Sequence, residues 1–348
     1  MLAALLLLAA APTPSLDALF SGLAGPRTPG LAVAVRRDGR EIFRKGYGAR
    51  DLRSYQPIGP RSNFRLASFT KQFTAAAVML LVRDGKLRYD DTLPALFPGF
   101  SDYGRTVTVR HLLTHTSGLP DYEELMDSRW TAERQIRDAD VLDLLKGQSH
   151  GKFAPGTSWA YSNSAYVLLG LAVAKASGLP FDEFLSRRIF QPLGMSRTLA
   201  YVRGRNSVPE RVYGHSLRDG QLVETDQSPT SATLGDGGIY SNLEDLAKWD
   251  DALTKGTLLR PHELELAWTP VHLADGSEPR WPKEPGGDNL NPGKPVSYGF
   301  GWFLNPFNGM TRRWHSGSTS GFRTVIERFP KTGLTIIILC NRTDLDPD

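Results

Sequence analysis

The chain has 348 residues, enough to bury a full hydrophobic core and to hold two subdomains. Hydrophobic residues make up 40% and charged residues 22% of it, which is ordinary for a globular protein. The 41 Lys and Arg against 37 Asp and Glu leave a net charge of only +4, and the basic residues are scattered, so the composition argues against a nucleic-acid partner.

The first eleven residues are apolar and end in small side chains. This pattern is typical of the core and cleavage region of a secretory signal, although no Lys or Arg precedes Arg27. The segment is only half of the roughly 20 residues needed to cross a bilayer, so we expect no stable membrane span. We interpret residues 1–11 as the remnant of a signal peptide and expect an exported protein, periplasmic or secreted. A plain N-terminal hydrophobic helix is the alternative.

Two apolar strands are predicted at residues 30–36 and 41–48, joined by an Asp-Gly turn. From residue 68 to about 267, helical patterns dominate and are punctuated by Gly and Pro. Strand patterns return in the last fifty residues, at 298–303, 312–315, 324–329 and 334–339.

Strands at both chain ends with helices between them predict an α/β fold of the α+β type. We expect an antiparallel sheet built from both ends and flanked by helices, with an inserted, mainly helical subdomain. A single domain would cover residues 12–348, with its sheet region at about 15–80 and 295–348 and its helical region at about 81–294. Residues 272–296 lack periodicity and are rich in Pro, Gly, Asn and Asp, which indicates a surface loop or a lid over a site.

A Ser-x-x-Lys motif, Ser68 to Lys71, stands at the head of the apolar run at residues 73–82. Residues three apart share a face of a helix, so the Lys71 amine would lie beside the Ser68 hydroxyl. Desolvation by apolar neighbours would lower the pKa of that amine, which could then take the serine's proton and make a nucleophile of it. An ordinary amphipathic helix with a surface lysine is the alternative.

The chain contains a second motif of the same spacing, Ser149 to Lys152. Gly151 and Pro155 mark that segment as a loop, where the two side chains would not be held on one face. We therefore predict a nucleophile at Ser68 and none at Ser149.

Three further segments carry side chains suited to acyl transfer, although each is weak alone. A tyrosine near an ammonium ionises more easily, and an asparagine amide both donates and accepts hydrogen bonds. A glycine at a strand end lets a substrate approach the backbone closely. The segments are Tyr161-Ser162-Asn163, His315-Ser316-Gly317 and the turn-rich stretch from His115 to Tyr122. We interpret the last of these as shaping a loop and assign no chemistry to His115.

Metal and cofactor signatures are missing from the sequence. The single cysteine, Cys340, ends an apolar run and has no clustered histidines, so neither an intrachain disulfide nor a metal site is expected. The glycines at 235–238 are not followed by the Gly-Lys-Ser/Thr of a phosphate-binding loop. We predict no metal and no organic cofactor.

The order of these motifs closely resembles that of the penicillin-recognising serine hydrolases. The nearest branches look like class C β-lactamases, serine D-Ala-D-Ala carboxypeptidases, D-amino-acid peptidases and β-lactamase-like esterases. The resemblance runs from about residue 31 to residue 341. It implies a hydrolase that forms an acyl-enzyme on an ester, a β-lactam or a small peptide with a D-residue. A small molecule or short peptide would then be the partner, and the oligomeric state stays open.

The resemblance also implies a role for each matched residue. Ser68 would be the acylated nucleophile, Lys71 its general base, and Tyr161 the relay of protons to the leaving group and from the deacylating water. Backbone N–H groups of Ser68 and Ser318 would form an oxyanion hole, in which each donor is typically worth about 3 kcal/mol of barrier. The substrate-binding residues implied are Asn163, His315, Ser316, Gly317, Ser318 and Arg323.

One departure from the family pattern bears on the substrate. His315 stands where many β-lactamases carry lysine, so a permanent positive charge that would pair with a substrate carboxylate is missing. Arg323 is a candidate to supply this charge, and a surface strand arginine is the alternative. Four aromatic residues either line an apolar pocket or belong to the core: Trp302, Trp314, Tyr122 and Phe322.

Three alternatives to a β-lactamase-like activity remain at this stage. The chain could be a family-VIII-type carboxylesterase, or a D-Ala-D-Ala carboxypeptidase or D-aminopeptidase. It could also be a non-catalytic, penicillin-binding-like ligand sensor. The residues do not select the acyl donor, because loops rather than the fold shape the pocket.

Overall fold

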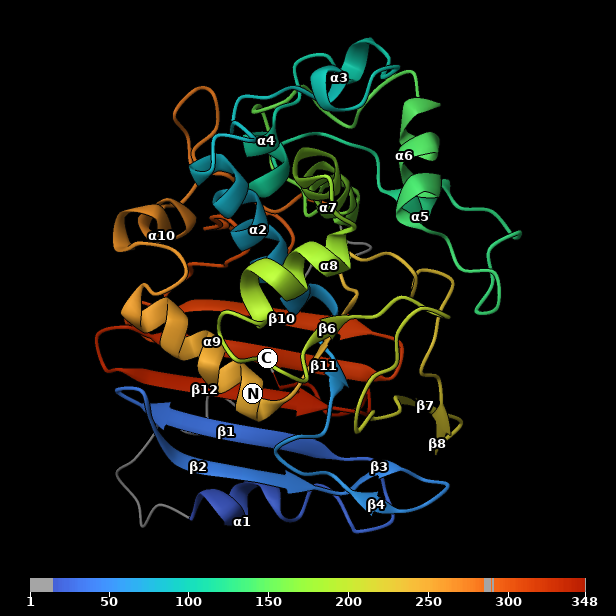
Figure 1. The fold of residues 1–348 in the computed structure, drawn as a ribbon, viewed down its shortest axis with the longest axis vertical. Coiled ribbons are helices and arrows are strands. Elements are labelled where there is room, and N and C mark those ends of the chain that lie inside the picture. Colours follow the sequence, from blue (N-terminus) through green and yellow to red (C-terminus); the bar gives the residue numbers. More distant parts are fainter. Residues whose placement is uncertain (1–14, 285–288, 290, 348) are drawn as a thin grey trace.

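The computed structural model describes residues 15–284, 289 and 291–347 (Figure 1). Residues 1–11, which we interpret as a signal-peptide remnant, lie outside the described residues. No single helix in the described ranges is long and apolar enough to cross a bilayer. One pair bent by 75°, Asn163–Ser177 with Phe181–Phe190, passes the length and composition test only when its two parts are joined.

A five-stranded antiparallel sheet forms the lower half of the molecule in Figure 1. Its strands are β1 (Leu31–Arg37), β2 (Arg40–Tyr47), β10 (Arg313–Thr319), β11 (Phe322–Phe329) and β12 (Leu334–Cys340). The order is β10-β11-β12-β1-β2, so β12 lies at the centre and pairs with β1 on one side and β11 on the other. The predicted sheet, antiparallel and drawn from both chain ends, is confirmed.

The other described elements lie mostly between β2 and β10 in the chain. Three small sheets join β5 (Phe64–Arg65) and β6 (Leu199–Ala200) to β9 (Ile239–Ser241), β3 (Ala49–Asp51) to β4 (Gln56–Pro57), and β7 (His215–Arg218) to β8 (Gln221–Glu224). The helices are α1 (Leu16–Phe20), α2 (Lys71–Arg83), α3 (Leu93–Leu96), α4 (Val109–Leu113), α5 (Tyr122–Leu125), α6 (Asp138–Lys146), α7 (Asn163–Ser177), α8 (Phe181–Leu185), α9 (Leu243–Lys255) and α10 (Pro261–Ala267). Short turns of other helix types cover Ala67–Thr70, Asp102–Gly104 and Ser186–Phe190.

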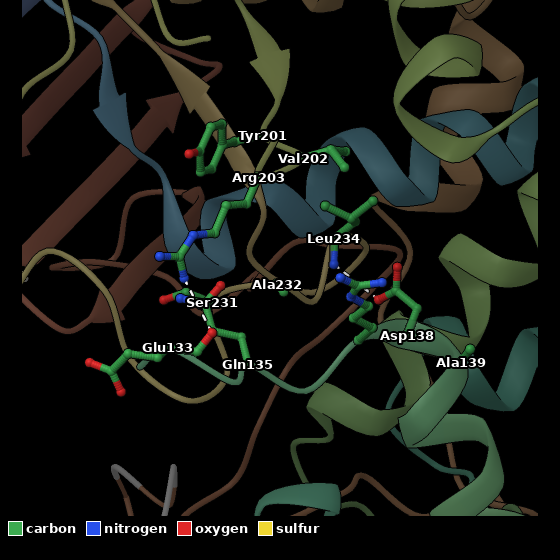
Figure 2. A pocket seen from close by; sticks show the side chains of 11 residues that line it. Glu133, Gln135, Asp138, Ala139, Tyr201, Val202, Arg203, Ser231, Ala232 and Leu234 are labelled. Atoms are coloured by element: carbon green, nitrogen blue, oxygen red, sulfur yellow. Dashed lines mark hydrogen bonds between the residues drawn. The ribbon is translucent and has the colours of Figure 1, made fainter. Parts of the chain in front are cut away.

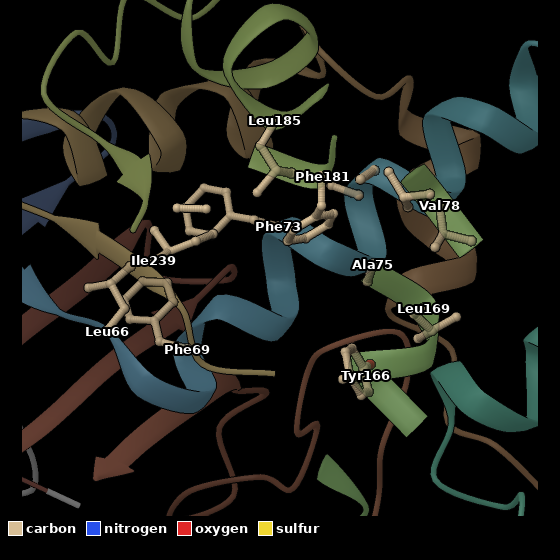
Figure 3. Close-up of a cluster of buried hydrophobic side chains, with 14 of the residues drawn as sticks. Leu66, Phe69, Phe73, Ala75, Val78, Tyr166, Leu169, Phe181, Leu185 and Ile239 are labelled. Carbon is tan, nitrogen blue, oxygen red and sulfur yellow. The ribbon is translucent and has the colours of Figure 1, made fainter. Parts of the chain in front are cut away.

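Helices α2 and α7 lie at the centre of the largest apolar core. Nearly every residue of α2 is buried, as expected for a helix that is apolar on all sides. Figure 3 shows Phe73 of α2 and Tyr166 of α7 in this cluster, with Ile239 of β9. The same cluster includes Ala34 of β1 and Ile337 of β12, so the helices and the sheet share one core.

Helix α9 comes from the middle of the chain but packs on the sheet (Figure 1). Its Asp250 accepts hydrogen bonds from Arg328 at 2.8 Å and from Thr335 at 2.9 Å, and forms an ion pair with Arg36. The predicted helical region therefore contains an element that belongs with the sheet, because a buried carboxylate there satisfies arginines of two strands.

The described part of segment 272–296 contains no helix or strand, as predicted. Trp281 nevertheless is buried. Its ring stacks on Phe303, with centroids 5.9 Å apart, and meets the edge of Trp159 at 4.8 Å. These contacts fix this part of the loop as a wall of an aromatic cluster.

Candidate active site

Ser68 lies in the short 3₁₀ turn that leads into α2. The preceding residue, Ala67, has a φ of 50°, in the left-handed region that costs an L-residue roughly 1–2 kcal/mol. Ala67 and Phe69 are buried, whereas Ser68 is partly exposed. The turn thus directs one polar side chain out of an otherwise buried segment.

The amine of Lys71 lies beside this hydroxyl, as the three-residue spacing predicts. Lys71 is fully buried, and its Nζ is 3.1 Å from Ser68 Oγ. The amine also donates to Asn163 Oδ1 at 2.8 Å and to the Asp236 carbonyl at 3.0 Å. Two fixed acceptors therefore hold the nitrogen in place next to Ser68.

Asn163 reaches Lys71 because it begins α7. Ser162 caps that helix, and its hydroxyl accepts a hydrogen bond from the Ala165 N–H at 3.1 Å. The Asn163 amide then bridges Lys71 and Glu123, since its Nδ2 donates to Glu123 Oε1 at 3.4 Å. A carboxylate thus lies one side chain away from the amine.

Tyr161 lies against Lys71, as expected from the sequence order. The Lys71 Nζ is 4.9 Å from the centroid of the Tyr161 ring. That ring stacks on Phe303 at 6.3 Å with planes 7° apart, and contacts the His115 ring at 4.4 Å. Its plane is therefore fixed by two neighbouring rings.

His115 is a residue to which the sequence argument gave no chemical role. It is fully buried, and it holds both neighbours of Tyr161: its carbonyl accepts from the Ala160 N–H at 3.1 Å, and its Nδ1 accepts from the Ser162 N–H at 3.1 Å. Burial lowers the pKa of His115 well below its usual value, and Lys71 and His315 add to this, so the ring stays neutral. Its position in a His-Thr-Ser-Gly motif was the only signal in the sequence.

His315 on β10 is buried behind Tyr161 and Lys71 rather than open to solvent. Its Nδ1 is 2.6 Å from the Ser316 carbonyl and therefore donates, which leaves Nε2 to accept from Tyr298 Oη at 3.1 Å. Burial lowers the pKa of His315 to about 3, with Lys71 as the second cause. The ring is therefore neutral at physiological pH and presents no positive charge.

Gly317 lets β10 pass directly against the Ser68 turn. A Cβ at this position would lie 2.1 Å from the Leu66 carbonyl oxygen and 3.1 Å from the Ser68 nitrogen. The close approach that Gly317 permits here is that of the chain itself, and the predicted approach of a substrate stays a prediction.

The backbone of β10 exposes donors at the same edge of the sheet. Trp314 uses its N–H and its carbonyl to pair with Phe303, on the side away from β11. Because backbone groups alternate in direction along a strand, the N–H groups of Ser316 and Ser318 point to that same edge. The Ser318 donor and the Ser68 turn thus meet at one place.

Arg323 is not brought to this place. It pairs with Ser318 across the sheet, on the face that Val325 also occupies, and Val325 belongs to the core on the α1 side. Its guanidinium donates to the carbonyls of Thr319 at 3.0 Å and Phe322 at 2.9 Å. Because side chains alternate between the two faces of a strand, Arg323 points away from Ser68. The alternative, an ordinary strand arginine, therefore describes it better than a substrate-binding residue.

The four aromatic residues named as pocket or core are mainly core. Tyr122, Trp302 and Phe322 are buried in the largest cluster, and Trp314 is half-buried and stacks on Phe303. The aromatic wall beside Tyr161 consists instead of Trp159, Trp281, Tyr298 and Phe303.

A pocket of about 350 Å³ lies beside the segment that carries Asp236 (Figure 2). At its wall the Leu234 N–H donates to Asp138 Oδ1 at 3.0 Å. Burial, together with the charge of Asp236, raises the pKa of Asp138 to about 8. None of the predicted site residues lines this pocket. Over the described ranges, no group of three or more His, Cys, Asp or Glu side chains is placed to hold a metal ion.

Comparison with known proteins identifies the family of this chain. A family model described as Beta-lactamase matches residues 16–348. This chain belongs to the beta-lactamase family. Penicillin-binding protein 4* of Bacillus subtilis (strain 168) is 33% identical over 345 residues, which cover 94% of this chain and 72% of the relative. The putative penicillin-binding protein PbpX of the same organism is 28% identical, over 89% of this chain and 69% of the relative.

Solved structures support the beta-lactamase fold. The octameric penicillin-binding protein homologue from Pyrococcus abyssi superposes with a TM-score of 0.77 at 27% identity, covering 92% of this chain and 71% of that one. The D-amino acid amidase from Ochrobactrum anthropi SV3, complexed with L-phenylalanine amide, has a TM-score of 0.73 at 26% identity, covering 90% of this chain and 86% of that one. The predicted fold class and the predicted family are both confirmed.

Proposed function

We propose that this protein is a serine hydrolase that cleaves its substrate through an acyl-enzyme on Ser68. The observation that carries the proposal is the buried Lys71 amine 3.1 Å from Ser68 Oγ, with the Tyr161 ring beside it. Binding without turnover needs neither an amine nor a phenol next to a hydroxyl. The non-catalytic sensor is therefore the weaker alternative.

The reaction would proceed in two acyl transfers. Ser68 Oγ attacks the carbonyl carbon while Lys71 Nζ takes its proton, and the bond to the leaving group breaks as Tyr161 relays a proton to that group. Water then attacks the acyl carbon, its proton returns through Tyr161 and Lys71, and Ser68 is released. The three side chains act as a unit because each passes the same proton.

The oxyanion formed in each step would be held by two backbone donors. The N–H groups of Ser68 and Ser318 are the candidates, since Gly317 brings β10 against the Ser68 turn and strand alternation directs the Ser318 N–H outward. Fixed dipoles of this kind stabilise developing charge because they need no reorganisation, and each is worth about 3 kcal/mol.

The charges around the site favour a neutral acyl donor, an ester or an amide, over a substrate with a carboxylate next to the scissile bond. His315 is neutral and bonded at both nitrogens, and Arg323 faces the opposite side of the sheet. Neither residue supplies the charge that would anchor a β-lactam carboxylate. We therefore rank ester or amide hydrolysis above efficient β-lactam hydrolysis.

A second candidate is hydrolysis of amides or peptides of D-amino acids. Glu123 places a carboxylate at the Asn163 amide, where it would attract a free ammonium group on a substrate. The similarity to a D-amino acid amidase at 26% identity agrees with this reading. An N-acylated analogue, which lacks the ammonium, should then react more slowly than the free amine.

A parallel rate panel tests the proposal. Wild type and Ser68→Ala are compared on a short-chain nitrophenyl ester, a D-amino acid amide, a D-Ala-D-Ala peptide and a chromogenic cephalosporin. We expect the ester or the amide to be the best substrate, and the substitution to reduce its turnover roughly 10⁴-fold or more. Ser149→Ala serves as the matched control, because that serine has the same Ser-x-x-Lys spacing in a loop.

Two results would contradict the proposal. Unchanged hydrolysis by the Ser68→Ala variant would show that Ser68 is not the nucleophile. Failure of a fluorophosphonate to label Ser68 in the folded wild type, together with no turnover across the panel, would favour the sensor.

Export remains part of this proposal. A secretory signal that includes residues 1–11 would deliver the enzyme to the periplasm or the medium, where its partner would be a small molecule or short peptide. Expression of the intact chain followed by N-terminal sequencing of the exported product checks it, since cleavage is expected near Ala11.

A further inference from the structure

Three arginines lie in one row across the sheet, far along the strands from Ser318. Arg313 of β10 is opposite Arg328 of β11, which is opposite Thr335 of β12, which is opposite Arg36 of β1. All four side chains are on the face that α9 covers, since Asp250 of α9 contacts three of them. Like charges placed directly opposite each other destabilise a sheet, so each arginine needs a compensating anion.

Two of the three arginines are compensated within the chain. Arg36 forms ion pairs with Asp250 and Asp251, and the Arg328 Nε donates to Asp250 at 2.8 Å. Arg328 also donates to the Thr254 hydroxyl at 2.6 Å. The carboxylates of α9 thus pair with the arginines of β1 and β11, on either side of β12.

Arg313 is left without such an anion. Among the residues that the structure describes, no carboxylate forms an ion pair with it; its guanidinium instead lies 3.7 Å above the Trp268 ring. The side chain is half-buried, and burial lowers its pKa to about 10, with Arg328 as the second cause. A cation that is partly desolvated and next to a like charge favours an anionic ligand.

A cavity of about 250 Å³ adjoins this guanidinium. Arg313, Arg328, Trp268 and Thr254 line it, and the buried Trp268 Nε1 has no hydrogen-bond partner among the described residues. Two carboxylates also line it. Asp250 is already engaged by Arg36, Arg328 and Thr335, and Asp38 lies in the β1–β2 turn, three strand spacings of about 4.8 Å from β10. The end of the cavity at Arg313 is therefore positive.

We propose that this cavity is a binding site for a small oxyanion, a phosphate or carboxylate group held by Arg313 and Arg328. A guanidinium matches two oxygens of such a group with parallel N–H donors, and the Trp268 ring fixes the plane of that fork. The unpartnered indole N–H of Trp268 offers a further donor, whereas the Thr254 hydroxyl already donates to the Asp250 carbonyl at 2.9 Å. None of these residues belongs to the proposed hydrolase site, so the two proposals stand or fall separately.

Thermal unfolding and calorimetric titration test the site. The wild type is titrated with sodium phosphate and, separately, with sodium acetate, each against NaCl at equal ionic strength. We expect saturable binding with a Kd of roughly 1 mM and a rise in Tm of about 2 °C or more at saturation. Arg313→Gln should abolish both effects, whereas Arg37→Gln, which removes an exposed arginine of β1, should retain them.

Arg313→Lys provides a second variant in case the glutamine protein does not fold. It keeps the charge and the contact with Trp268 but loses the fork, so binding should weaken at least about tenfold. A response to phosphate alone, to acetate alone or to both supports the site and identifies the group bound. A response no larger than that to NaCl, or one that persists unchanged in the Arg313 variants, overturns it.

Discussion

At the scale of single residues, the site is distinguished by side chains whose neutral or hydrogen-bonded state is fixed by burial. Lys71, His115 and His315 are all fully or almost fully buried, yet each has a polar atom bonded to a fixed partner. In a buried environment that excludes water, such hydrogen bonds are stronger than in solution and hold each side chain in one orientation. Proton transfer requires this orientation, because groups that are present but misplaced transfer a proton slowly.

His115 is expected to act as a positioning residue for Tyr161. His115→Ala removes the acceptor for the Ser162 N–H and the ring against Tyr161, so we expect kcat to fall about 10²-fold with a smaller change in KM. His115→Asn should recover part of this loss, because asparagine tolerates the φ of 60° and its amide oxygen accepts the same N–H. Steady-state kinetics on the best substrate measure both.

The control for this pair is His150→Ala, which removes an exposed loop histidine. Equal losses of kcat in the alanine and asparagine variants, or losses matched by a fall in the folded fraction, would mean that His115 serves packing alone.

Asp138 is expected to make the free energy of unfolding depend on pH. Its pKa of about 8 in the folded state exceeds the value of 3.8 expected in the unfolded chain. The folded protein thus holds a proton that the unfolded chain has lost, and stability falls as the pH rises from about 4 to 8. Asp138→Asn keeps an oxygen for the Leu234 N–H, so it should raise the urea midpoint at pH 8 and leave it unchanged near pH 4.

A midpoint that depends on pH equally in wild type and Asp138→Asn would contradict this assignment. Asp140→Asn is the matched control, since Asp140 lies in the same turn of α6 and its side chain likewise accepts a backbone N–H, that of Arg137 at 2.9 Å.

At the scale of elements, α9 is attached to the sheet through one carboxylate. Asp250 accepts from Arg328 and Thr335 and pairs with Arg36, so its removal leaves the buried Arg328 without its anion and Arg36 with Asp251 alone. Loss of one partner of a buried ion pair typically costs about 3–5 kcal/mol. Asp250→Ala should therefore lower the free energy of unfolding by about this amount, as measured by urea denaturation.

Asp251→Ala tests whether the effect belongs to the buried group. Asp251 is more exposed and contacts Arg36 at 2.5 Å, so we expect a cost below about 1 kcal/mol. Similar losses in the two variants would show that α9 is not held by Asp250.

The sequence predicts elements better than it predicts their partners. The Ser68–Lys71 contact follows from helical spacing, and the apolar runs of β1 and β12 identify buried strands. The direction of Arg323 does not follow, because it depends on the register between β10 and β11. His115 lies 47 residues from Ser162 in the chain, so its hydrogen bond is a property of the tertiary fold alone.

At the scale of the whole molecule, the sheet and the helices share one hydrophobic core. The largest core cluster joins Ala34 and Ile337 of the sheet to Phe73 and Leu169 of α2 and α7. We expect one unfolding transition in urea, with coincident midpoints from far-UV circular dichroism, tryptophan fluorescence and fluorophosphonate labelling of Ser68. Labelling that disappears at clearly lower urea than the circular dichroism signal would instead indicate a helical part that opens independently.

The central place of β12 has a consequence for biosynthesis. Strands β1 and β11 have no hydrogen-bonding partner between them until Leu334–Cys340 inserts there. During translation the ribosome must therefore pass residue 340 before the sheet can close and bring β10 to its final place beside the Ser68 turn. The Ser68 site thus forms in a single step once residue 340 has been made, rather than gradually as the chain grows.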